Sequence, residues 1–173
     1  MNEYVKSKIR DIKDFPKEGI IFRDITTAVK DKKALKEIVK YLTEEFIDEK
    51  IDYVAAIESR GFIFGSALAI NLDAGFILIR KPGKLPAKTI SQEYSLEYGV
   101  DRIEVHEDAI EEGKNVLVVD DLLATGGTIS AACKLVKKMK ANVVGAAFVI
   151  ELTELKGREK LPEEIKVVSM VKY

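Results

Sequence analysis

The chain has 173 residues, a length that fits one domain and excludes two full catalytic domains. Hydrophobic residues make up 47% of it and charged residues 33%, a balance that excludes a disordered or collagen-like chain and predicts a compact globule. The 28 Lys and Arg residues are balanced by 29 Asp and Glu residues, so the chain has no overall positive field with which to bind nucleic acid.

The absence of a long apolar stretch and the presence of only one cysteine and one histidine limit where the protein can reside and which metals it can bind. No stretch approaches the roughly 20 apolar residues of a membrane span, and residues 1–15 contain no apolar signal-peptide core. The single cysteine, Cys133, cannot form an internal disulfide, and the single histidine, His106, leaves little scope for a zinc site. We therefore expect a cytoplasmic protein that binds neither membrane nor nucleic acid, with a structural Cys133 and with His106 on the surface.

In the first part of the chain, apolar spacing predicts alternating helices and strands. Apolar residues recur every three or four positions over 32–49, which is typical of an amphipathic helix, and Asp31 is suited to cap its first turn. Residues 53–57 are short, apolar and partly β-branched, as in a buried strand; a helix over 62–71 and a strand over 75–79 follow. This order predicts parallel pairing of the two strands.

The middle of the chain is less regular. Residues 81–92 are polar, contain prolines and a glycine, and carry no apolar period, so we expect a mobile loop. Weak alternation over 94–105 predicts a hairpin that turns around Gly99.

The last third of the chain alternates again and sets the fold class. It predicts, in order, the most apolar strand of the chain, a helix and two further strands, over residues 115–119, 128–140, 142–150 and 165–171. We expect one α/β domain over residues 1–173, with a central, mostly parallel sheet flanked by helices and a small appendage from residues 1–25.

The strongest local signal is VLVVDDLLATGGT, residues 116–128, in which an apolar strand, two carboxylates and a short loop lead to a glycine pair that opens a helix. Ligands of open α/β sheets bind at the carboxyl edge of the strands, where this loop is expected to lie. The free N–H groups of a helix start favour a phosphate, and Thr125 and Thr128 add hydroxyl donors.

The acidic pair in this segment, Asp120 and Asp121, suits ribose hydroxyls or a metal held through water. The loop therefore fits a sugar phosphate. The plainer interpretation is that Asp120 caps a turn and that the glycines only shape a loop.

The segment DDLLATGGT after an apolar strand resembles the phosphoribosyl-diphosphate (PRPP) motif of the type I phosphoribosyltransferases. Further segments are similar, in the same order along the chain, to the adenine phosphoribosyltransferases: FPKEGIIFRDIT (15–26), ESRGFIFG (58–65), RKPGKLP (80–86), YSLEYG (94–99) and ELTELKGREKL (151–161). The resemblance covers nearly the whole chain. It implies the type I phosphoribosyltransferase fold, with residues 1–25 as a small hood over the base site and with a flexible loop.

The resemblance also implies a reaction, in which the 5-phosphoribosyl group of PRPP passes to adenine and gives AMP and diphosphate for purine salvage. It implies Mg²⁺ held mainly by PRPP and water rather than by direct protein ligands, and a homodimer. Xanthine or hypoxanthine as the base is an alternative, because the PRPP loop is shared and only the base wall discriminates. A regulatory domain that binds PRPP without catalysis is a second alternative, disfavoured because residues 1–14 are too short for a helix-turn-helix.

Three groups of residues receive PRPP-binding roles from the resemblance. The 5′-phosphate falls to Ala124, Thr125, Gly126, Gly127 and Thr128, and the ribose to Asp120 and Asp121. The diphosphate falls to Ser59, Arg60, Gly61, Arg80, Lys81 and Lys84, whose cations would neutralise the leaving charge. The resemblance further implies a cis peptide between Glu58 and Ser59. From pattern alone, Arg60 could instead pair with Glu58 at the surface, and Lys84 and Lys88 could be solvated.

Residues of the base site come from two segments. Ile21, Phe22 and Arg23 resemble the segment that covers adenine, and a flat purine suits an apolar wall. Without the resemblance, residues 20–22 would be interpreted as a small core strand.

Glu97 and Tyr98 resemble the loop residues that close over the base, where Glu97 would aid proton movement on the ring. Together with Arg60 they are the predicted catalytic residues. The pattern alone fits equally well a hairpin that has Tyr94 and Tyr98 on one face and Glu97 solvated on the other.

Overall fold

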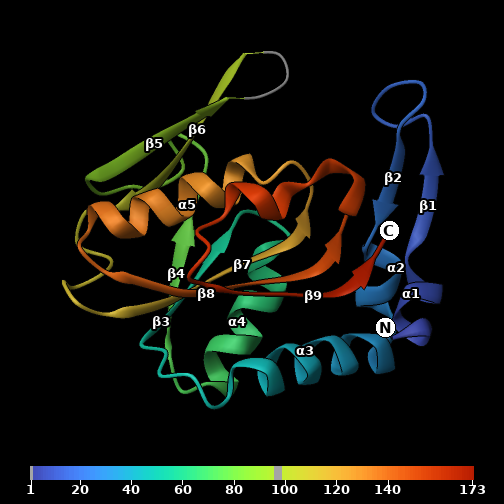
Figure 1. Cartoon of the computed structure of the whole chain (residues 1–173), viewed down its shortest axis with the longest axis horizontal. Helices are drawn as coiled ribbons and strands as arrows, with labels where there is room; N and C mark the ends of the chain where they lie inside the picture. Colours follow the sequence, from blue (N-terminus) through green and yellow to red (C-terminus); the bar gives the residue numbers. More distant parts are fainter. Residues whose placement is uncertain (1, 96–98) are drawn as a thin grey trace.

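A five-stranded parallel sheet forms the centre of the fold, with the strand order β4–β3–β7–β8–β9 (Figure 1). The computed structural model of the chain describes residues 2–95 and 99–173. The strands of this sheet are β3 (Tyr53–Ile57), β4 (Gly75–Ile79), β7 (Asn115–Leu123), β8 (Asn142–Glu151) and β9 (Lys166–Lys172). The predicted α/β class with a mostly parallel central sheet is confirmed.

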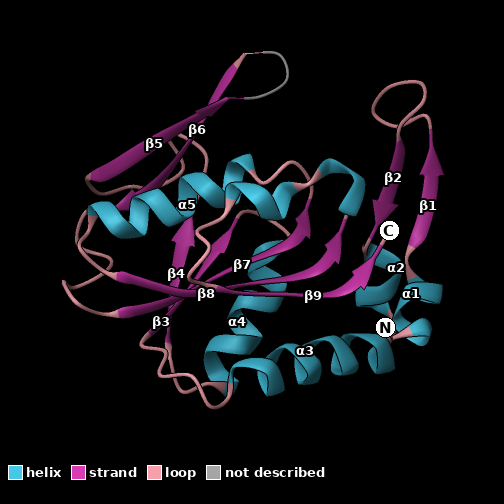
Figure 2. Ribbon diagram, in the orientation of Figure 1, coloured by secondary structure: helices cyan, strands magenta, loops and turns pink. Residues whose placement is uncertain are grey.

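Helices cover both faces of this sheet (Figure 2). Helix α5 (Gly127–Lys138) lies on one face, and helices α3 (Lys32–Phe46) and α4 (Gly61–Asn71) lie on the other. Two apolar clusters fill the two interfaces, one between the sheet and α3 and α4, the other between the sheet and α5. Strands β3, β7 and β8 are therefore buried on both faces, which explains their apolar sequences, whereas the edge strand β4 keeps Phe76 and Leu78 exposed.

Helix α3 shows how the sequence pattern becomes structure. The Asp31 side chain accepts hydrogen bonds from the N–H groups of Lys33 and Ala34, as predicted for its N-cap. Every fourth residue from Ala34 onward is buried, and the last of these is Phe46. Ile47 is 54% exposed, so the apolar face ends there and the helix stops before the predicted residue 49.

Strand β7 runs to Leu123, past the predicted end at residue 119. Its neighbour β8 continues to pair with it, with Leu123 opposite Glu151, whereas β3 pairs with it only as far as Val119. The polar Asp120 and Asp121, which suggested that the strand had ended, are held in it from one side only. On the side of β3 no strand pairs with β7 beyond Val119.

Two antiparallel hairpins stand outside the main sheet. The first consists of β1 (Arg10–Lys13) and β2 (Ile21–Asp24), and the short helices α1 (Glu3–Lys8) and α2 (Thr26–Lys30) flank it. The second consists of β5 (Thr89–Ser95) and β6 (Val100–His106). In the view of Figure 1 both hairpins rise above the sheet, on the side that carries α5.

The prediction of an irregular loop over 81–92 is wrong for its last part. Residues 89–92 belong to β5, with Thr89 opposite His106 and Gln92 opposite Ile103. Backbone pairing with β6 supplies an order that no apolar period in these residues indicates.

Three smaller features complete the description. The turns η1 (Thr153–Leu155) and η2 (Gly157–Lys160) connect β8 to β9.

Cys133 is buried in α5, where desolvation raises the pKa of its thiol to about 11. His106 is half-buried and accepts a hydrogen bond from the Ala87 N–H. Within residues 2–95 and 99–173, no helix combines the length and the apolar character that crossing a membrane requires.

Candidate active site

The turn after β3 and the end of β7 meet at the carboxyl edge of the sheet. Arg60 Nε lies 2.7 Å from Asp121 Oδ2, an ion pair between the predicted diphosphate turn and the predicted ribose pair. Gly61 permits this approach, because a Cβ there would lie 3.0 Å from the Val119 carbonyl oxygen and 3.1 Å from Asp120 Oδ1. The alternative in which Arg60 pairs with Glu58 is wrong, since the nearer carboxylate belongs to the neighbouring strand.

The two adjacent carboxylates are poorly solvated. Asp121 is 4% exposed, and Asp120 Oδ1 accepts the Asp121 N–H at 2.8 Å. Burial raises the pKa of both groups; the Asp121 carboxylate raises that of Asp120 further, and the Arg60 guanidinium opposes the rise at Asp121. A desolvated pair of oxygens at a strand end is well suited to accept hydrogen bonds from sugar hydroxyls.

Beyond this pair, residues 124–128 turn from β7 into α5 around a small cavity. Gly126 has φ +77° and immediately precedes α5, a conformation that disfavours any residue with a Cβ. The cavity measures about 70 Å³ and is lined by Asp120 and residues 122–129. The N–H groups of the first helical turn have no partner within the helix, and they make this cavity favourable for an anion.

The cations predicted to bind diphosphate have carboxylate partners. Arg80 Nε lies 2.5 Å from Glu58 Oε2, and the backbone N–H of Lys81 donates to Glu58 Oε1 at 2.9 Å. The Lys81 ammonium contacts the Asp101 carboxylate and the Tyr94 hydroxyl. Lys84 is exposed at the side chain, and its carbonyl oxygen accepts from Arg80. An incoming anion must therefore compete with existing ion pairs.

The electrostatics of Glu58 follow from these contacts. Burial opposes its ionisation, but the Lys81 N–H and the Arg80 guanidinium outweigh burial and lower the pKa of Glu58. The peptide bond between Glu58 and Ser59 is cis, as the resemblance implies. Ser59 itself is exposed beside the turn.

The first hairpin reaches the same site through β2. The Arg60 guanidinium lies 5.3 Å from the centre of the Phe22 ring. Phe15, in the loop between β1 and β2, packs edge-on against the same ring. Ile21 is 45% exposed, so the interpretation of residues 20–22 as a core strand is wrong. The Arg23 side chain is held by Asp11 and stacks on Tyr173, so Phe22 is the β2 side chain that contacts the Arg60 turn.

Comparison with known proteins decides the family. The sequence matches the phosphoribosyl transferase domain family over residues 25–173. It is 54% identical to the adenine phosphoribosyltransferase of Thermosynechococcus vestitus, with 98% of this chain and 99% of the relative covered. The crystal structure of adenine phosphoribosyltransferase from Thermoanaerobacter pseudethanolicus superposes with a TM-score of 0.95 at 50% identity and covers 99% of both chains. The chain belongs to the adenine phosphoribosyltransferase family.

A third adenine phosphoribosyltransferase bears on the ligand. The Saccharomyces cerevisiae enzyme, 40% identical with 97% of each chain covered and a TM-score of 0.90, was solved with adenine and with an imino-altritol bisphosphate. A base and a phosphorylated sugar analogue therefore occupy a protein of the same fold.

The adenine phosphoribosyltransferase family resemblance names two residues that the structure leaves untested. Glu97 and Tyr98 lie outside the described residues. Their neighbours Tyr94 and Ser95 reach the phosphate loop: a Cβ on Gly127 would lie 3.4 Å from the Tyr94 ring and 3.5 Å from the Ser95 carbonyl oxygen. Strand β5 therefore leads directly to this loop.

Sequence reasoning missed several residues of this adenine phosphoribosyltransferase site. Asp101 and Tyr94 hold Lys81, but an acidic residue at the start of a hairpin strand carries no signal of its partner. Gly157 packs on the phosphate loop from the connection between β8 and β9. Gly157 belongs to the segment ELTELKGREKL, whose resemblance to the family was recognised, but nothing in that segment indicated a contact with the phosphate loop.

Proposed function

We propose that the chain transfers the 5-phosphoribosyl group of PRPP to adenine and releases AMP and diphosphate. One observation carries the proposal: the Arg60 turn, the acidic pair and the loop that opens α5 meet at one sheet edge, with Arg60 Nε 2.7 Å from Asp121. Cationic, acidic and helix-start groups in this order match the diphosphate, ribose and phosphate of PRPP. We assign adenine as the base because the chain belongs to the adenine phosphoribosyltransferase family.

The 5′-phosphate is proposed to bind in the cavity of residues 124–128. The free N–H groups at the start of α5 would donate to its oxygens, and the hydroxyls of Thr125 and Thr128 would add further donors. Asp120 and Asp121 would accept hydrogen bonds from the ribose hydroxyls, which are neutral donors and are therefore suited to carboxylate partners. The ribose is then fixed between two rigid elements, strand β7 and helix α5.

The diphosphate is proposed to bind to the turn of Ser59, Arg60 and Gly61 and to the cations that follow β4. As the bond between C1 of the ribose and the diphosphate loosens, negative charge grows on the leaving group. Arg60, Arg80, Lys81 and Lys84 would stabilise that charge. Arg80 and Lys81 would exchange their Glu58 and Asp101 partners for phosphate oxygens, so binding involves a change of ion pairs.

Adenine is proposed to lie beside β2, with the Phe22 ring near its face and the backbone of Ile21 and Arg23 at its edge. A ring nitrogen of adenine then attacks C1 as the diphosphate departs. The resemblance implies that Glu97 and Tyr98 would close over the base and assist its proton transfer. Closure also excludes water, which would otherwise compete as the nucleophile.

We further propose that the reaction uses Mg²⁺, and the carboxylates Asp120 and Asp121 at the ribose end of the site fit it. Asp121 is engaged by Arg60, and Asp120 accepts a backbone N–H. Asp120 and Asp121 would hold the ion through its waters. When bound, Mg²⁺ neutralises part of the charge on the diphosphate.

The proposed homodimer is supported by an apolar patch on α4 and β4. Ile63 and Ile70, two turns apart on α4, are 40% and 81% exposed. Phe76 and Leu78 point from one face of β4, and the Phe76 ring packs edge-on against Phe62 of α4, so the two elements form one surface. A helix that is apolar on all sides is usually buried, so a second copy of the chain is the proposed cover.

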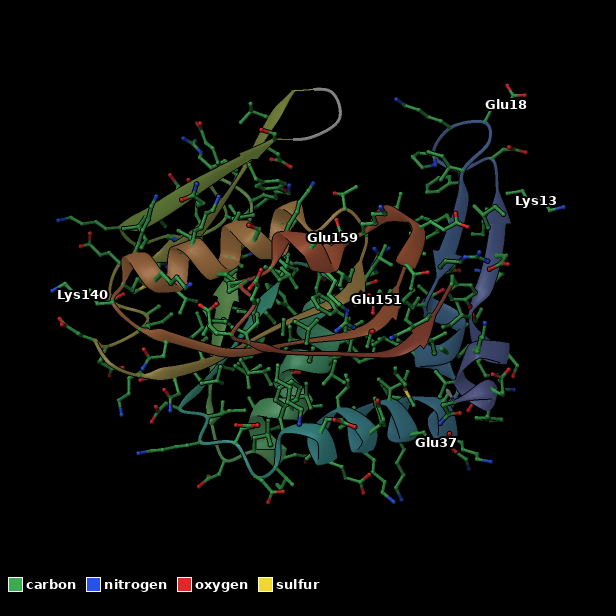
Figure 3. All side chains as sticks on the ribbon, in the orientation of Figure 1. Lys13, Glu18, Glu37, Lys140, Glu151 and Glu159 are labelled. Carbon is green, nitrogen blue, oxygen red and sulfur yellow. The ribbon has the colours of Figure 1, made fainter. Side chains whose placement is uncertain are left out.

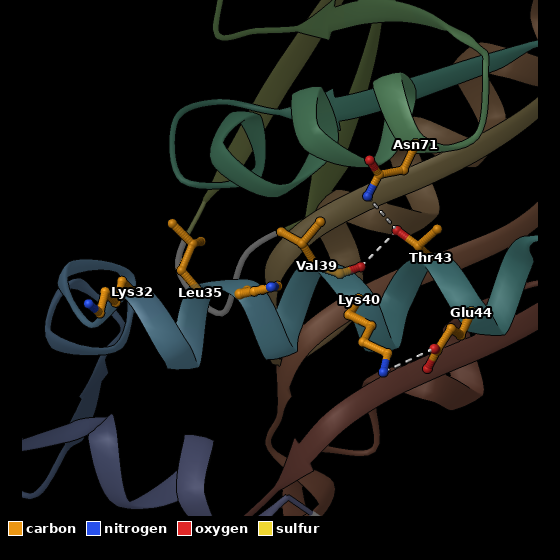
Figure 4. A pocket seen from close by; sticks show the side chains of 8 residues that line it. Lys32, Leu35, Val39, Lys40, Thr43, Glu44 and Asn71 are labelled. Atoms are coloured by element: carbon orange, nitrogen blue, oxygen red, sulfur yellow. Dashed lines mark hydrogen bonds and ion pairs between the residues drawn. The ribbon is translucent and has the colours of Figure 1, made fainter.

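A groove lies along α3 and reaches the end of α4 at Asn71 (Figure 4). It measures about 600 Å³ and is lined by Lys32, Leu35, Lys36, Val39, Lys40, Thr43, Glu44 and Asn71. The apolar side chains of Leu35 and Val39 face it, and Asn71 donates to the Thr43 hydroxyl where α4 meets α3. Lysines and a glutamate surround the apolar centre, an arrangement typical of a protein interface.

Sedimentation of the wild type and of Ile70→Lys tests the dimer. We expect the wild type to sediment at twice the chain mass and the variant at the chain mass, because a buried lysine charge opposes association. Val100→Lys, on the distant hairpin, serves as the control and should remain dimeric. A monomeric wild type, or a dimeric Ile70→Lys, would contradict this face as the interface.

The reaction itself is tested by giving the purified chain PRPP, adenine and Mg²⁺ and by quantifying AMP and diphosphate. Formation of the two products in equal amounts is expected. PRPP binding without product would instead support the non-catalytic regulatory alternative. The single cysteine is consistent with a reducing compartment, so we propose the cytoplasm as the place of this reaction.

A further inference from the structure

Two backbones approach each other very closely where the connection between β8 and β9 crosses the phosphate loop. A Cβ on Gly126 would lie 2.2 Å from the Gly157 carbonyl oxygen, and a Cβ on Gly157 would lie 2.1 Å from the Ala124 carbonyl oxygen. Real Cβ atoms do not approach backbone so closely, so each glycine is needed by the other. Gly157 is buried and does not line the cavity of residues 122–129, so it supports the loop from behind.

The residue that follows Gly157 is fixed by a polar network. Arg158 donates from Nε and Nη2 to the two carboxylate oxygens of Glu151, at 3.0 and 2.6 Å. The same guanidinium donates to the Val167 carbonyl oxygen at 2.7 Å and to the Ser169 hydroxyl at 3.1 Å. Glu151 is 5% exposed and lies within the fold, beneath the segment that carries the exposed Glu159 (Figure 3).

This network ties the connection to the central sheet. Glu151 ends β8, and Val167 and Ser169 belong to β9, so one guanidinium joins η2 to two strands. A bidentate contact between arginine and a carboxylate fixes direction as well as distance. Hydrogen bonds from Arg158 lower the pKa of Glu151, and Glu151 raises the pKa of Arg158, so both groups are ionised around neutral pH.

We propose that the Arg158–Glu151 pair positions Gly157 against residues 124–128 and thereby sets the affinity for the 5′-phosphate of PRPP. The inference rests on the proposed function for the identity of that ligand. Arg158 and Glu151 do not line the phosphate cavity, so they act through Gly157 as positioning residues. When the pair is broken, η2 loses its attachment to the sheet, and the N–H groups of the loop lose their alignment on the phosphate.

Three variants test the chain of contacts at separate points. Arg158→Lys keeps the positive charge but cannot contact both carboxylate oxygens. Gly157→Ala leaves the ion pair intact and places a Cβ against the Ala124 carbonyl oxygen. Ser169→Ala removes one contact of the guanidinium and is the mildest change, so it decides the question if the other two variants do not fold. Lys140→Met breaks an exposed pair with Glu112 and is the control.

The measurements separate phosphate binding from the other steps. Calorimetry gives the dissociation constant of ribose 5-phosphate, AMP formation gives kcat and the KM values of PRPP and adenine, and thermal unfolding shows which variants are folded. For Arg158→Lys and Gly157→Ala we expect the ribose 5-phosphate dissociation constant and the PRPP KM to rise about tenfold, which is about 1.4 kcal/mol. The KM of adenine should change less than about twofold, Ser169→Ala should show a smaller rise of the same kind, and Lys140→Met should match the wild type.

Either of two results would overturn the inference: folded variants that bind ribose 5-phosphate as tightly as the wild type, or equal rises in the KM values of PRPP and adenine. A wild type that bound ribose 5-phosphate but formed no AMP would contradict the proposed function instead. The binding measurements on the variants would still decide whether the pair positions the loop.

Discussion

Replacing Gly126 by alanine tests the packing of the phosphate loop, and Gly113 offers a matched control. Both glycines have a positive φ, +77° and +81°, and an alanine in this region costs about 1–2 kcal/mol because its Cβ crowds the next carbonyl. At Gly113 no atom lies within 4 Å of the added Cβ, whereas at Gly126 the Cβ meets the Gly157 carbonyl oxygen at 2.2 Å. Relief of that overlap adds about 1–3 kcal/mol, as in other overpacked sites.

The two variants should therefore differ in stability. We expect the free energy of unfolding to fall by about 1–2 kcal/mol in Gly113→Ala and by about 2–5 kcal/mol in Gly126→Ala. Thermal denaturation resolves this difference, since each kcal/mol lowers the midpoint by about 2–4 °C in a domain of this size.

Ligand binding separates the variants further. Gly126→Ala should weaken ribose 5-phosphate binding at least about tenfold in calorimetry, because the loop must move away from Gly157. Gly113→Ala should bind as the wild type does, because Gly113 precedes β7 at the opposite edge of the sheet. Equal loss of stability in the two variants, or undiminished binding by folded Gly126→Ala, would show that the contact between Gly126 and Gly157 does not shape the phosphate loop.

Arg60→Gln removes the guanidinium proposed to stabilise the leaving diphosphate and should lower kcat/KM about 10²–10³-fold in the AMP assay; a loss below about threefold would contradict a catalytic role. Asp24 is buried, and hydrogen bonds from Thr26 and Arg10 lower its pKa from 3.8 to about 2. Because the folded state holds the lower pKa, this group contributes about 2 kcal/mol above pH 4, and the contribution is lost as the pH falls toward 2. Asp24→Asn should be less stable by that amount at pH 7, and the difference in unfolding free energy should narrow in acid; a constant difference would argue against the ionised group as its source. The double variant Glu97→Gln, Tyr98→Ala should lower kcat and leave ribose 5-phosphate binding unchanged, and undiminished turnover would remove the proposed base-closing role.

The central helices and strands could be predicted because each one carries its own apolar pattern. The apolar period of α3 and the short apolar run of β3 reflect burial that each element shows along its own length. Strand β5 was missed over residues 89–92, because its order comes from pairing with β6 and not from an apolar face. The end of β7 was misplaced for a related reason, since pairing with β8 continues through the polar Asp120 and Asp121.

The candidate site divides in the same way. The loop at residues 124–128 was identified because its glycines, hydroxyls and strand context are contiguous in the chain. The partner of Arg60 could not be predicted, because Asp121 is brought to it only by the adjacency of β3 and β7. Contacts between segments distant in sequence, such as Gly157 on Gly126, depend on where the whole connection packs.

The base that this site joins to PRPP is proposed to be adenine. The most direct measurement is product formation from PRPP and Mg²⁺ with adenine, hypoxanthine, guanine and xanthine supplied together at equal concentration and the nucleotides separated by chromatography. We expect AMP as the dominant nucleotide, with diphosphate in equal amount. A dominant oxopurine nucleotide would contradict the assignment of the base, and no nucleotide from any base would contradict the proposed activity itself.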